Sequence, residues 1–356
     1  MSDRQQRLRA SLQGEGLLVA PGAYDGLSAR LVERAGFPAV YASGGAMARA
    51  ACLPDLNLVS LKEIADQVER ICDAVGLPVI ADGDTGHGGP LNVYRTVRLL
   101  RRAGAAALHL EDQVFPKRCG HYDDKSVVST AEMLQRLRAA RDAADGLVLI
   151  ARTDALAIEP FEVVMERAHR YMEAGADLIF VEAPRSEAEI ERIAAALPYP
   201  KLINMFHGGK TPLLPAGRLE QLGYRVMIVP SDLQRAAIGA MQKTLAAIHR
   251  DGHSRTLEDL MVSFAERETV IGTAEWLAPD SRHDRGQLLP RRAAAGAGGS
   301  ASWFIPRIRF SRLLRMCARI AASARSGLPS FSAARIAWCS SSALSGRPGM
   351  ELKRMR

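Results

Sequence analysis

Acidic residues stand at the ends of two short apolar runs, and their types and spacing could bind a metal ion. Asp82 and Asp84 are two positions apart at the end of the run Pro78–Asp82, and Glu111 ends the run Ala107–Glu111. Side chains two apart on a strand face the same side, so the two aspartates repel each other unless a cation lies between them. Oxygen ligands without His or Cys favour Mg²⁺, with Mn²⁺ as the alternative. Asp-Gly-Asp could also be a simple turn, but the neighbouring Glu111 favours a metal site.

A second group with chemical potential is the segment Pro116-Lys117-Arg118-Cys119-Gly120-His121, which surrounds a thiol with basic residues. Nearby positive charge favours the thiolate, so Cys119 is a candidate acid or base. The alternative is a free cysteine in a mobile basic loop. Cys52 and Cys72 are interpreted as small core residues, and His109, in the middle of an apolar run, as a hydrogen-bonded interior residue.

Two further features could bind an anion. Ser43-Gly44-Gly45 offers backbone N–H groups where the chain can approach a ligand closely, although an ordinary turn would look the same. Arg152 follows the apolar residues Leu147–Ile150 and should face an anion rather than the core. A structural ion pair with Glu182 or Asp154 is the alternative for this arginine.

For these residues to form one site, the ends of the predicted strands must lie close together, and the hydrophobic pattern predicts a fold of this kind. Apolar runs rich in β-branched residues alternate with segments of helical periodicity, which is the pattern of a (β/α)8 TIM barrel. A doubly wound open sheet is less favoured, because Pro21-Gly22-Ala23-Tyr24 is not a glycine-rich phosphate turn. The predicted strands are Leu17–Ala20, Ala39–Ser43, Pro78–Asp82, Ala107–Glu111, Leu147–Arg152, Leu178–Glu182, Lys201–Met205 and Arg225–Val229.

The helices between these strands carry start and stop signals. Capping boxes are predicted at Ser60…Glu63, Ser129…Glu132 and Ser186…Glu189. Glycines at 36, 104 and 175 follow helical segments and precede strands, so we expect left-handed caps there. Helical pattern continues after Ser231 to about Trp276, beyond what eight units require, and could cap the barrel or contact a partner subunit.

Charge divides the chain into two parts. The net charge is +8 over 356 residues, but residues 291–356 hold thirteen Lys and Arg against the single acid Glu351, a net +12. Residues 1–290 therefore carry 8 − 12 = −4. We interpret residues 1–290 as the catalytic barrel with its C-terminal helices, and residues 291–356 as a basic tail that is disordered or non-native.

The composition also bears on partners and location. Five cysteines, an odd number without a C-x-x-C pair, argue against a disulfide framework or a zinc site. The polar N-terminus lacks a signal-peptide run and no stretch has the length of a membrane span, so we expect a cytoplasmic protein. Residues 306–325 could form a basic amphipathic helix, and a basic-tailed binding protein is the alternative from another functional class. We favour neither a nucleic-acid nor a membrane partner.

In combination, the motifs resemble those of the isocitrate lyase/phosphoenolpyruvate mutase superfamily over roughly residues 15–280. The branches that look most similar are the 2-methylisocitrate lyases, the 2,3-dimethylmalate lyases and the carboxyphosphonoenolpyruvate phosphonomutase-like proteins. The basic cysteine loop makes the combination specific. The motifs are Ser43-Gly44-Gly45, Asp82-Gly83-Asp84-Thr85-Gly86, Glu111-Asp112-Gln113, Lys117-Arg118-Cys119-Gly120-His121, Ala151-Arg152-Thr153-Asp154-Ala155 and Val181-Glu182-Ala183.

The resemblance implies a TIM barrel whose late helix is swapped between subunits, giving a homo-oligomer, a dimer or a tetramer. It implies that Mg²⁺ is held by Asp82 and Asp84, with Asp55 and Glu111 in its shell. A small carboxylate substrate would bind the metal through its keto-acid part. The substrate-binding residues implied in this way are Ser43, Gly44, Gly45, Gly120, Arg152, Glu182, Asn204, His207 and Arg235.

The resemblance also implies catalytic roles. Cys119 would protonate a carbanion from a gating loop, with Lys117 and His121 biasing its ionisation. Tyr41 would take the proton of the substrate hydroxyl, and Arg152 would stabilise the oxyanion. These roles predict retro-aldol cleavage of a 2-hydroxy polycarboxylate to pyruvate or a similar keto acid. An oxaloacetate decarboxylase or a phosphonomutase on the same barrel is the alternative.

One departure from the family pattern concerns the distal end of the substrate. Family members often have a glutamate before Gly-Gly-Lys-Thr-Pro, where this chain has His207. A histidine there could add a cation for an extra carboxylate or change the substrate. The sequence therefore predicts the reaction class without fixing the substrate.

Overall fold

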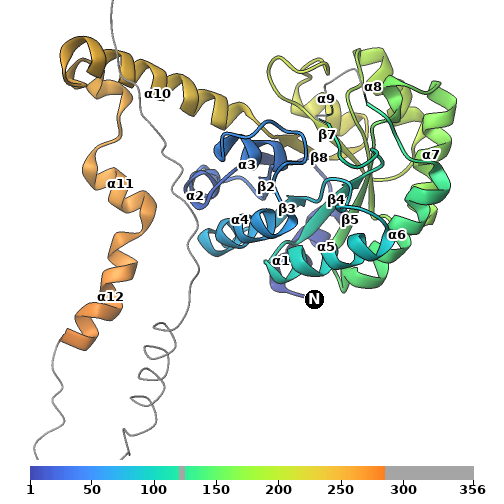
Figure 1. Cartoon of the computed structure of the whole chain (residues 1–356), viewed down its shortest axis with the longest axis horizontal. Helices are drawn as coiled ribbons and strands as arrows, with labels where there is room; N and C mark the ends of the chain where they lie inside the picture. The colour runs from blue at the N-terminus through green and yellow to red at the C-terminus, as the bar shows by residue number, and fades with distance from the viewer. Residues whose placement is uncertain (119, 121–124, 285–356) are drawn as a thin grey trace, which may run out of the picture. The chain divides into compact units, whose positions relative to one another are not determined.

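Eight parallel strands close into a barrel, and the strands follow each other around it in chain order (Figure 1). The computed structural model describes residues 1–118, 120 and 125–284, with side chains to residue 278. β8 pairs with β1 and closes the barrel, as predicted for a (β/α)8 fold. The strands are β1 (Leu18–Ala23), β2 (Val40–Ala42), β3 (Val79–Asp82), β4 (Ala107–Glu111), β5 (Val148–Thr153), β6 (Leu178–Val181), β7 (Lys201–Asn204) and β8 (Tyr224–Val229).

Each predicted strand overlaps one of these, with differences only at the ends. The largest concerns β1, which was predicted to end at Ala20 and ends at Ala23. The strand continues, since Pro21 pairs with Val229 and Gly22 pairs with Tyr41.

Helices surround the barrel and alternate with its strands along the chain (Figure 1). α1 precedes β1, and α10 to α12 follow β8. The helices are α1 (Asp3–Gln13), α2 (Gly26–Arg34), α3 (Gly44–Ala50), α4 (Leu61–Ala74), α5 (Pro90–Arg102), α6 (Thr130–Ala144), α7 (Phe161–Glu173), α8 (Glu187–Ala196), α9 (Ala216–Gln221), α10 (Asp232–Asp251), α11 (Phe264–Ile271) and α12 (Thr273–Asp284), with short 3₁₀ turns at Ala155–Ala157 and Arg255–Leu260.

The predicted caps begin and end the expected helices. Ser60 accepts a hydrogen bond from the Glu63 backbone and Glu63 bonds back, which completes a capping box. Ser129 and Ser186 cap their helices from one side only, because Glu132 and Glu189 hydrogen-bond to Arg136 and to the Arg185 backbone instead. Glycines 36, 104 and 175 adopt φ values of 81°, 97° and 105°, as expected for left-handed caps.

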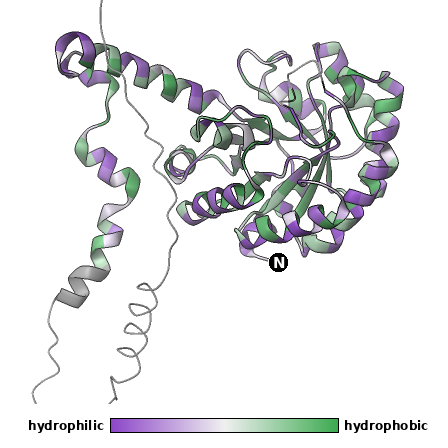
Figure 2. Cartoon of the chain, viewed as in Figure 1, coloured by the Kyte–Doolittle hydropathy of each residue, from purple (hydrophilic) through white to green (hydrophobic). Residues whose placement is uncertain are grey.

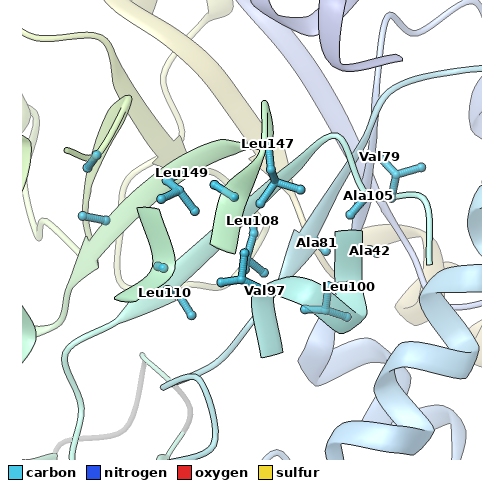
Figure 3. Close-up of a cluster of buried hydrophobic side chains, with 14 of the residues drawn as sticks. Ala42, Val79, Ala81, Val97, Leu100, Ala105, Leu108, Leu110, Leu147 and Leu149 are labelled. Carbon is cyan, nitrogen blue, oxygen red and sulfur yellow. The ribbon is translucent and has the colours of Figure 1, made fainter. Parts of the chain in front are cut away.

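The apolar side chains form one layer inside the barrel and another between strands and helices. Ile80, Val148 and Phe180 lie in the inner layer. Leu108 and Leu149 point outward into the second layer, beneath α5 and its neighbours (Figure 3). The hydrophobic strands are surrounded by helices, and each helix carries both apolar and polar residues (Figure 2). Because both faces of the sheet are covered, a polar group on a strand needs a partner within the protein.

The two cysteines interpreted as core residues differ. Cys72 is buried on α4, as predicted, and burial raises the pKa of its thiol to about 12. The prediction for Cys52 is wrong, because this residue is exposed and adopts a left-handed φ of 57° in the turn after α3.

The chain divides by internal contacts into Met1–Gln287 and Leu288–Arg356. The predicted basic tail, residues 291–356, lies outside the described residues. In the described part, α11 contacts α2, and Arg34 donates to the Thr269 carbonyl. None of the described helices combines the length and the apolar character that crossing a membrane requires.

Candidate active site

A cavity of about 390 Å³ opens at the carboxyl ends of the strands, where TIM barrels carry their active sites. Most of the predicted site residues line it or contact residues that do. Asp84 and Glu111 lie beside the cavity and pair with Lys117 and Arg152. Cys119 and His121 lie outside the described residues. The predicted residues that line the cavity are Tyr41, Ser43, Gly45, Asp55, Asp82, Lys117, Gly120, Arg152, Glu182, Asn204, His207 and Arg235.

The acidic part of this site is built around a buried lysine. The Lys117 ammonium lies 2.6 Å from Asp55 and 2.9 Å from Asp84. Burial disfavours its charge, but Asp84, Asp55 and other carboxylates outweigh burial and raise its pKa. We expected Lys117 to influence the cysteine thiol. In the structure its ammonium contacts carboxylates.

The two aspartates of the Asp-Gly-Asp segment respond differently to their surroundings. Burial raises the pKa of Asp84 to about 6. Burial also opposes the charge of Asp82, but His109, Lys117 and Arg152 outweigh it and lower that pKa. Burial raises the pKa of Glu111 well above its usual value. For Asp84 and Glu111, the nearby positive charge does not outweigh burial, and a bound cation would add positive charge beside them.

The carboxylates of this site fit an open Mg²⁺ site better than a site in which protein ligands enclose the metal. No three His, Cys, Asp or Glu side chains of the described residues converge to enclose a metal. Mg²⁺ commonly uses one or two protein carboxylates and takes its other ligands from water or substrate. Neither Glu111 oxygen accepts a hydrogen bond from a described residue, and Asp84 Oδ1 is held only by its ion pair with Lys117. Asp82 and Asp84 could thus bind the ion directly, with Asp55 and Glu111 nearby.

Tyr41 and His109 form a second polar unit in the barrel interior. The Tyr41 hydroxyl lies 2.8 Å from His109 Nε2 and donates to Asp82 at 3.1 Å. His109 is fully buried and lies 3.3 Å from Asp82. The interior, hydrogen-bonded position predicted for this histidine is confirmed. Its contact with the site was missed, although a polar residue mid-strand at an inward-facing position was the available signal.

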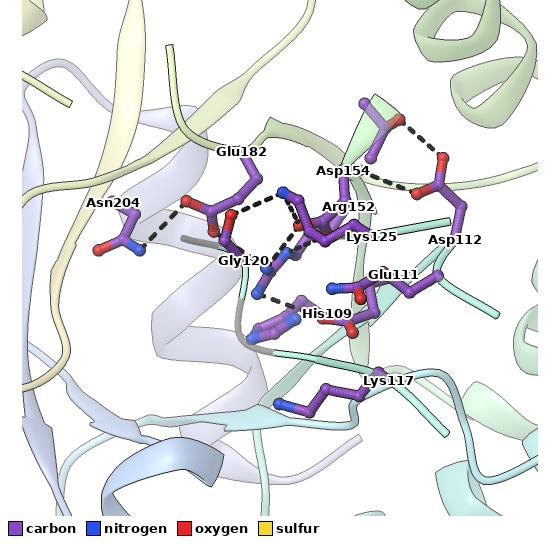
Figure 4. A network of polar contacts seen from close by, with 12 residues as sticks. His109, Glu111, Asp112, Lys117, Gly120, Lys125, Arg152, Asp154, Glu182 and Asn204 are labelled. Carbon is purple, nitrogen blue, oxygen red and sulfur yellow. Dashed lines mark hydrogen bonds and ion pairs between the residues drawn. The ribbon is translucent and has the colours of Figure 1, made fainter. Parts of the chain in front are cut away.

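Arg152 occupies the centre of a buried ion-pair network (Figure 4). It donates to Asp154 at 2.8 and 3.0 Å and lies 3.2 Å from Glu182 and 3.3 Å from Glu111. Its guanidinium also lies over the Phe180 ring. The structural ion pair that we gave as the alternative is present, and the same side chain lines the cavity, so Arg152 could serve both purposes.

Behind Arg152 lies a network that the sequence did not reveal. Lys125 donates to the Gly120 carbonyl at 2.6 Å and to Asp154 at 2.9 Å (Figure 4). Asp112 accepts from Thr153, from the Asp154 backbone and from Tyr171. A Cβ atom at Gly120 would collide with Arg152 and approach Glu182, so only glycine lets this backbone reach the cluster.

The Ser43-Gly44-Gly45 segment, whose backbone N–H groups we expected to be open to a ligand, begins α3. Ser43 caps this helix by accepting from the Ala46 backbone. The Gly44 N–H donates to Asp82 at 3.2 Å and is therefore engaged within the protein. A Cβ at Gly44 would come within 2.7 Å of that carboxylate, which explains the glycine by close packing.

The far wall of the cavity is more open and carries positive charge. Asn204 donates to Glu182 at 3.4 Å. His207 is exposed, and its backbone carbonyl accepts from the exposed Arg235. Arg49 also lines the cavity and was not among the predicted residues. It was missed because it belongs to a helix we had not predicted.

Comparison with known proteins agrees with the motifs. The profile of the phosphoenolpyruvate phosphomutase family matches residues 8–249. A probable 2-methylisocitrate lyase of Corynebacterium glutamicum is 45% identical over 255 residues, which cover 70% of this chain and 82% of that protein. The 2,3-dimethylmalate lyase of Eubacterium barkeri is 40% identical over 269 residues, which cover 75% of this chain and 93% of that one.

Solved structures share the barrel. A crystal structure of 2,3-dimethylmalate lyase, a PEP mutase/isocitrate lyase superfamily member, has a TM-score of 0.75 at 34% identity and covers 85% of this chain and 100% of that chain. Oxaloacetate acetylhydrolase with 3,3-difluorooxalacetate has a TM-score of 0.75 at 36% identity, covering 80% and 98%. Phosphonopyruvate hydrolase with oxalate and Mg²⁺ has a TM-score of 0.73 at 30% identity, covering 80% and 100%.

The chain belongs to the phosphoenolpyruvate phosphomutase family, within the PEP mutase/isocitrate lyase superfamily. This confirms the resemblance drawn from the motifs. The protein is an enzyme of the carbon–carbon lyase class, the class of its relatives at 40–45% identity.

Proposed function

We propose that this enzyme cleaves a 2-hydroxy polycarboxylate, similar to 2-methylisocitrate or 2,3-dimethylmalate, into pyruvate or a similar 2-oxo acid and a carboxylic acid. The observation that carries the proposal is the gathering of buried carboxylates, Tyr41 and Arg152 around one cavity at the barrel mouth. Relatives named for these two substrates support it.

Mg²⁺, held by Asp82 and Asp84 with Asp55 and Glu111 nearby, would supply positive charge for the oxygens of the 2-oxo acid product. The Mg²⁺ reported with phosphonopyruvate hydrolase supports this assignment. Arg152 supplies a fixed second charge, because Asp154 and Glu182 hold its guanidinium in one orientation.

The bond change needs one base and one acid. Tyr41 receives the proton of the 2-hydroxyl group, and its own proton can pass along its hydrogen bonds to His109 or Asp82. The C2–O bond becomes a carbonyl as the C2–C3 bond breaks, and the electron pair moves into the carboxylate attached to C3. Cys119 then protonates C3, and His121 favours the ionised form of the thiol afterwards.

A second candidate function rests on the solved structures. Oxaloacetate acetylhydrolase and phosphonopyruvate hydrolase share the barrel and act on smaller 2-oxo acids. An enzyme that breaks oxaloacetate or phosphonopyruvate could use the same metal site and Arg152. Such a reaction does not require an acid at Cys119, which gives the means to separate the two.

The test follows pyruvate release with a lactate dehydrogenase couple, and oxalate release with an oxalate oxidase couple, in the presence of Mg²⁺, because oxalate is the product of the similar oxaloacetate acetylhydrolase. The substrates are 2-methylisocitrate, 2,3-dimethylmalate, oxaloacetate and phosphonopyruvate, each given to the wild type and to Cys119→Ala. Cys52→Ala is the matched control, because Cys52 is an exposed cysteine outside the cavity lining.

We expect pyruvate from 2-methylisocitrate, 2,3-dimethylmalate or both, abolished by EDTA and reduced by about 100-fold or more in Cys119→Ala, with Cys52→Ala active. Release from oxaloacetate or phosphonopyruvate alone, with Cys119→Ala as active as the wild type, would contradict the proposed lyase and support the second candidate.

A further inference from the structure

The cavity mouth contains a positively charged side chain whose role the proposed reaction does not explain. Arg49 lies in α3 and lines the cavity. Its Nε donates to the Gln234 side chain at 3.1 Å. Among the described residues, no carboxylate forms an ion pair with Arg49 within 4 Å, so its guanidinium has no direct ionic partner in the described part of the protein.

This arginine is held in place rather than merely exposed. Gln234, on α10, is 6% exposed and donates through its amide nitrogen to the Ala46 carbonyl of α3 at 2.8 Å. That bond leaves the amide oxygen to accept from Arg49 and fixes the guanidinium on one side. The remaining two nitrogens are the paired donors that suit a carboxylate.

Arg49 also lies near Asp55, one of the carboxylates proposed to surround the metal. A Cβ at Gly45 would lie 2.8 Å from Asp55 Oδ2 and 3.2 Å from an Arg49 terminal nitrogen. Arg49 therefore lies near the Asp55 carboxylate, beside the Gly45 backbone. The other positive groups of the site differ, since Lys117, Arg152 and Arg235 each lie within 4 Å of a carboxylate.

We propose that Arg49 is a specificity-determining residue that binds the third carboxylate of a tricarboxylic substrate. This inference rests on the proposed lyase function and narrows its substrate class. A dicarboxylic hydroxy acid presents one carboxylate beside the 2-hydroxyl and one on the carbon that leaves. An additional carboxylate on that carbon would bind the Arg49 guanidinium, which has no direct ionic partner among the described residues, whereas Arg49 would contribute little to binding a dicarboxylate.

The experiment compares kcat/KM for 2-methylisocitrate, which has three carboxylates, with kcat/KM for 2,3-dimethylmalate, which has two. The variants are Arg49→Gln, Arg49→Lys and the control Arg95→Gln, an exposed arginine on the outer helix α5. Circular dichroism verifies that each variant is folded. A calorimetric titration with propane-1,2,3-tricarboxylate and with succinate measures binding without turnover.

We expect Arg49→Gln to lower the ratio of kcat/KM, tricarboxylate over dicarboxylate, by about tenfold or more, mainly through KM. Arg49→Lys should recover part of the ratio, because it keeps the charge without the paired donors. Arg95→Gln should keep the wild-type ratio. An unchanged ratio in Arg49→Gln, or an equal loss on both substrates, would overturn the inference.

The titration separates this inference from the proposed reaction. If the wild type cleaves neither hydroxy acid but binds propane-1,2,3-tricarboxylate more tightly than succinate, and Arg49→Gln removes that preference, the lyase proposal fails and the role of Arg49 stands. If cleavage occurs and neither the titration nor the kinetics shows a dependence on Arg49, the lyase stands and the role of Arg49 fails.

Discussion

Buried charge is the property that defines this site at the scale of single residues. Asp82, Asp84 and Glu111 are nearly inaccessible to water, and burial shifts the pKa of Asp84 to about 6. Leaving carboxylates in this state costs stability unless positive charge accompanies them. Lys117 supplies part of that charge by forming ion pairs with Asp55 and Asp84, and a divalent ion would supply more.

The first prediction concerns the metal at the residue scale. Mg²⁺ should raise the melting temperature of the wild type, because a ligand that binds only the folded state stabilises it. Asp84→Asn should lose most of that increase, since it removes one of the two proposed direct ligands. Asp66→Asn is the control, because Asp66 pairs with Lys62 on the surface of α4. Differential scanning fluorimetry with and without Mg²⁺ checks both, and an equal increase in all three proteins would contradict the assignment.

The second prediction concerns Lys125, whose ammonium is fully buried between Asp154 and the Gly120 carbonyl. Lys125→Met should lower the free energy of unfolding by about 3 kcal/mol, because removing one partner leaves a buried carboxylate with less compensation. It should also lower kcat, since Asp154 positions Arg152. Lys62→Met, which breaks an exposed pair, should change stability by less than about 1 kcal/mol. Urea denaturation measures the difference, and similar effects of the two variants would contradict this role.

At the scale of elements, Asp177 ties several segments together at the start of β6. Its carboxylate accepts from the Leu149 backbone of β5, from Arg141 of α6 and from Arg9 of α1. Burial opposes the charge of Asp177, but these hydrogen bonds outweigh burial and lower its pKa. Its interactions thus connect α1 and α6 to the barrel strands.

The third prediction follows from the sign of that shift. A carboxyl group whose pKa is lower in the folded state stabilises the protein above its unfolded pKa, about 3.9, and loses this contribution as pH falls through the folded pKa. Asp177→Asn should therefore lower the free energy of unfolding by about 1–2 kcal/mol at pH 7. The difference from wild type should shrink below about pH 4. Urea denaturation between pH 3 and pH 7 measures it, and a difference independent of pH would contradict the electrostatic explanation.

The elements were largely predictable because their signals are local. The face of α4 at Ile64, Val68 and Ile71 is buried as its periodicity predicted, and Ser60 caps the helix through a residue three positions away. α3 was missed because its seven residues, Gly44–Ala50, begin with two glycines and carry little helical signal. This omission also hid Arg49, whose place in the cavity depends on that helix.

At the scale of the whole molecule, closure of the barrel brings together side chains that are distant in sequence, and the sequence could not predict these pairs. The ends of successive strands were expected to meet, so most of the site could be gathered from the sequence. The pairing of Lys125 with Asp154 and of Asp112 with Tyr171 joins residues 29 and 59 positions apart. No local pattern specifies such partners, because they depend on how strands and helices pack after the barrel has closed.

The helices after the barrel carry large apolar side chains that the described part of the chain leaves exposed. Trp276 is 76% exposed and Phe264 is 72% exposed, and α10 adds Met241, Leu245 and Ile248. Large apolar side chains exposed on consecutive helices are typical of a protein interface. We propose that α10, α11 and α12 contact a second copy of the chain, which agrees with the dimer or tetramer expected from the resemblance.

The last prediction tests this interface. Phe264→Asp with Trp276→Asp should shift the full chain toward the monomer, because charges placed in an apolar interface lose hydration without gaining a partner. Leu91→Asp is the matched control, since Leu91 is 86% exposed on α5. Size-exclusion chromatography with light scattering gives the mass of each protein. A wild-type monomer, or a double variant that keeps the wild-type oligomer, would contradict the proposal. A shift confined to the double variant would assign α11 and α12 to the subunit contact.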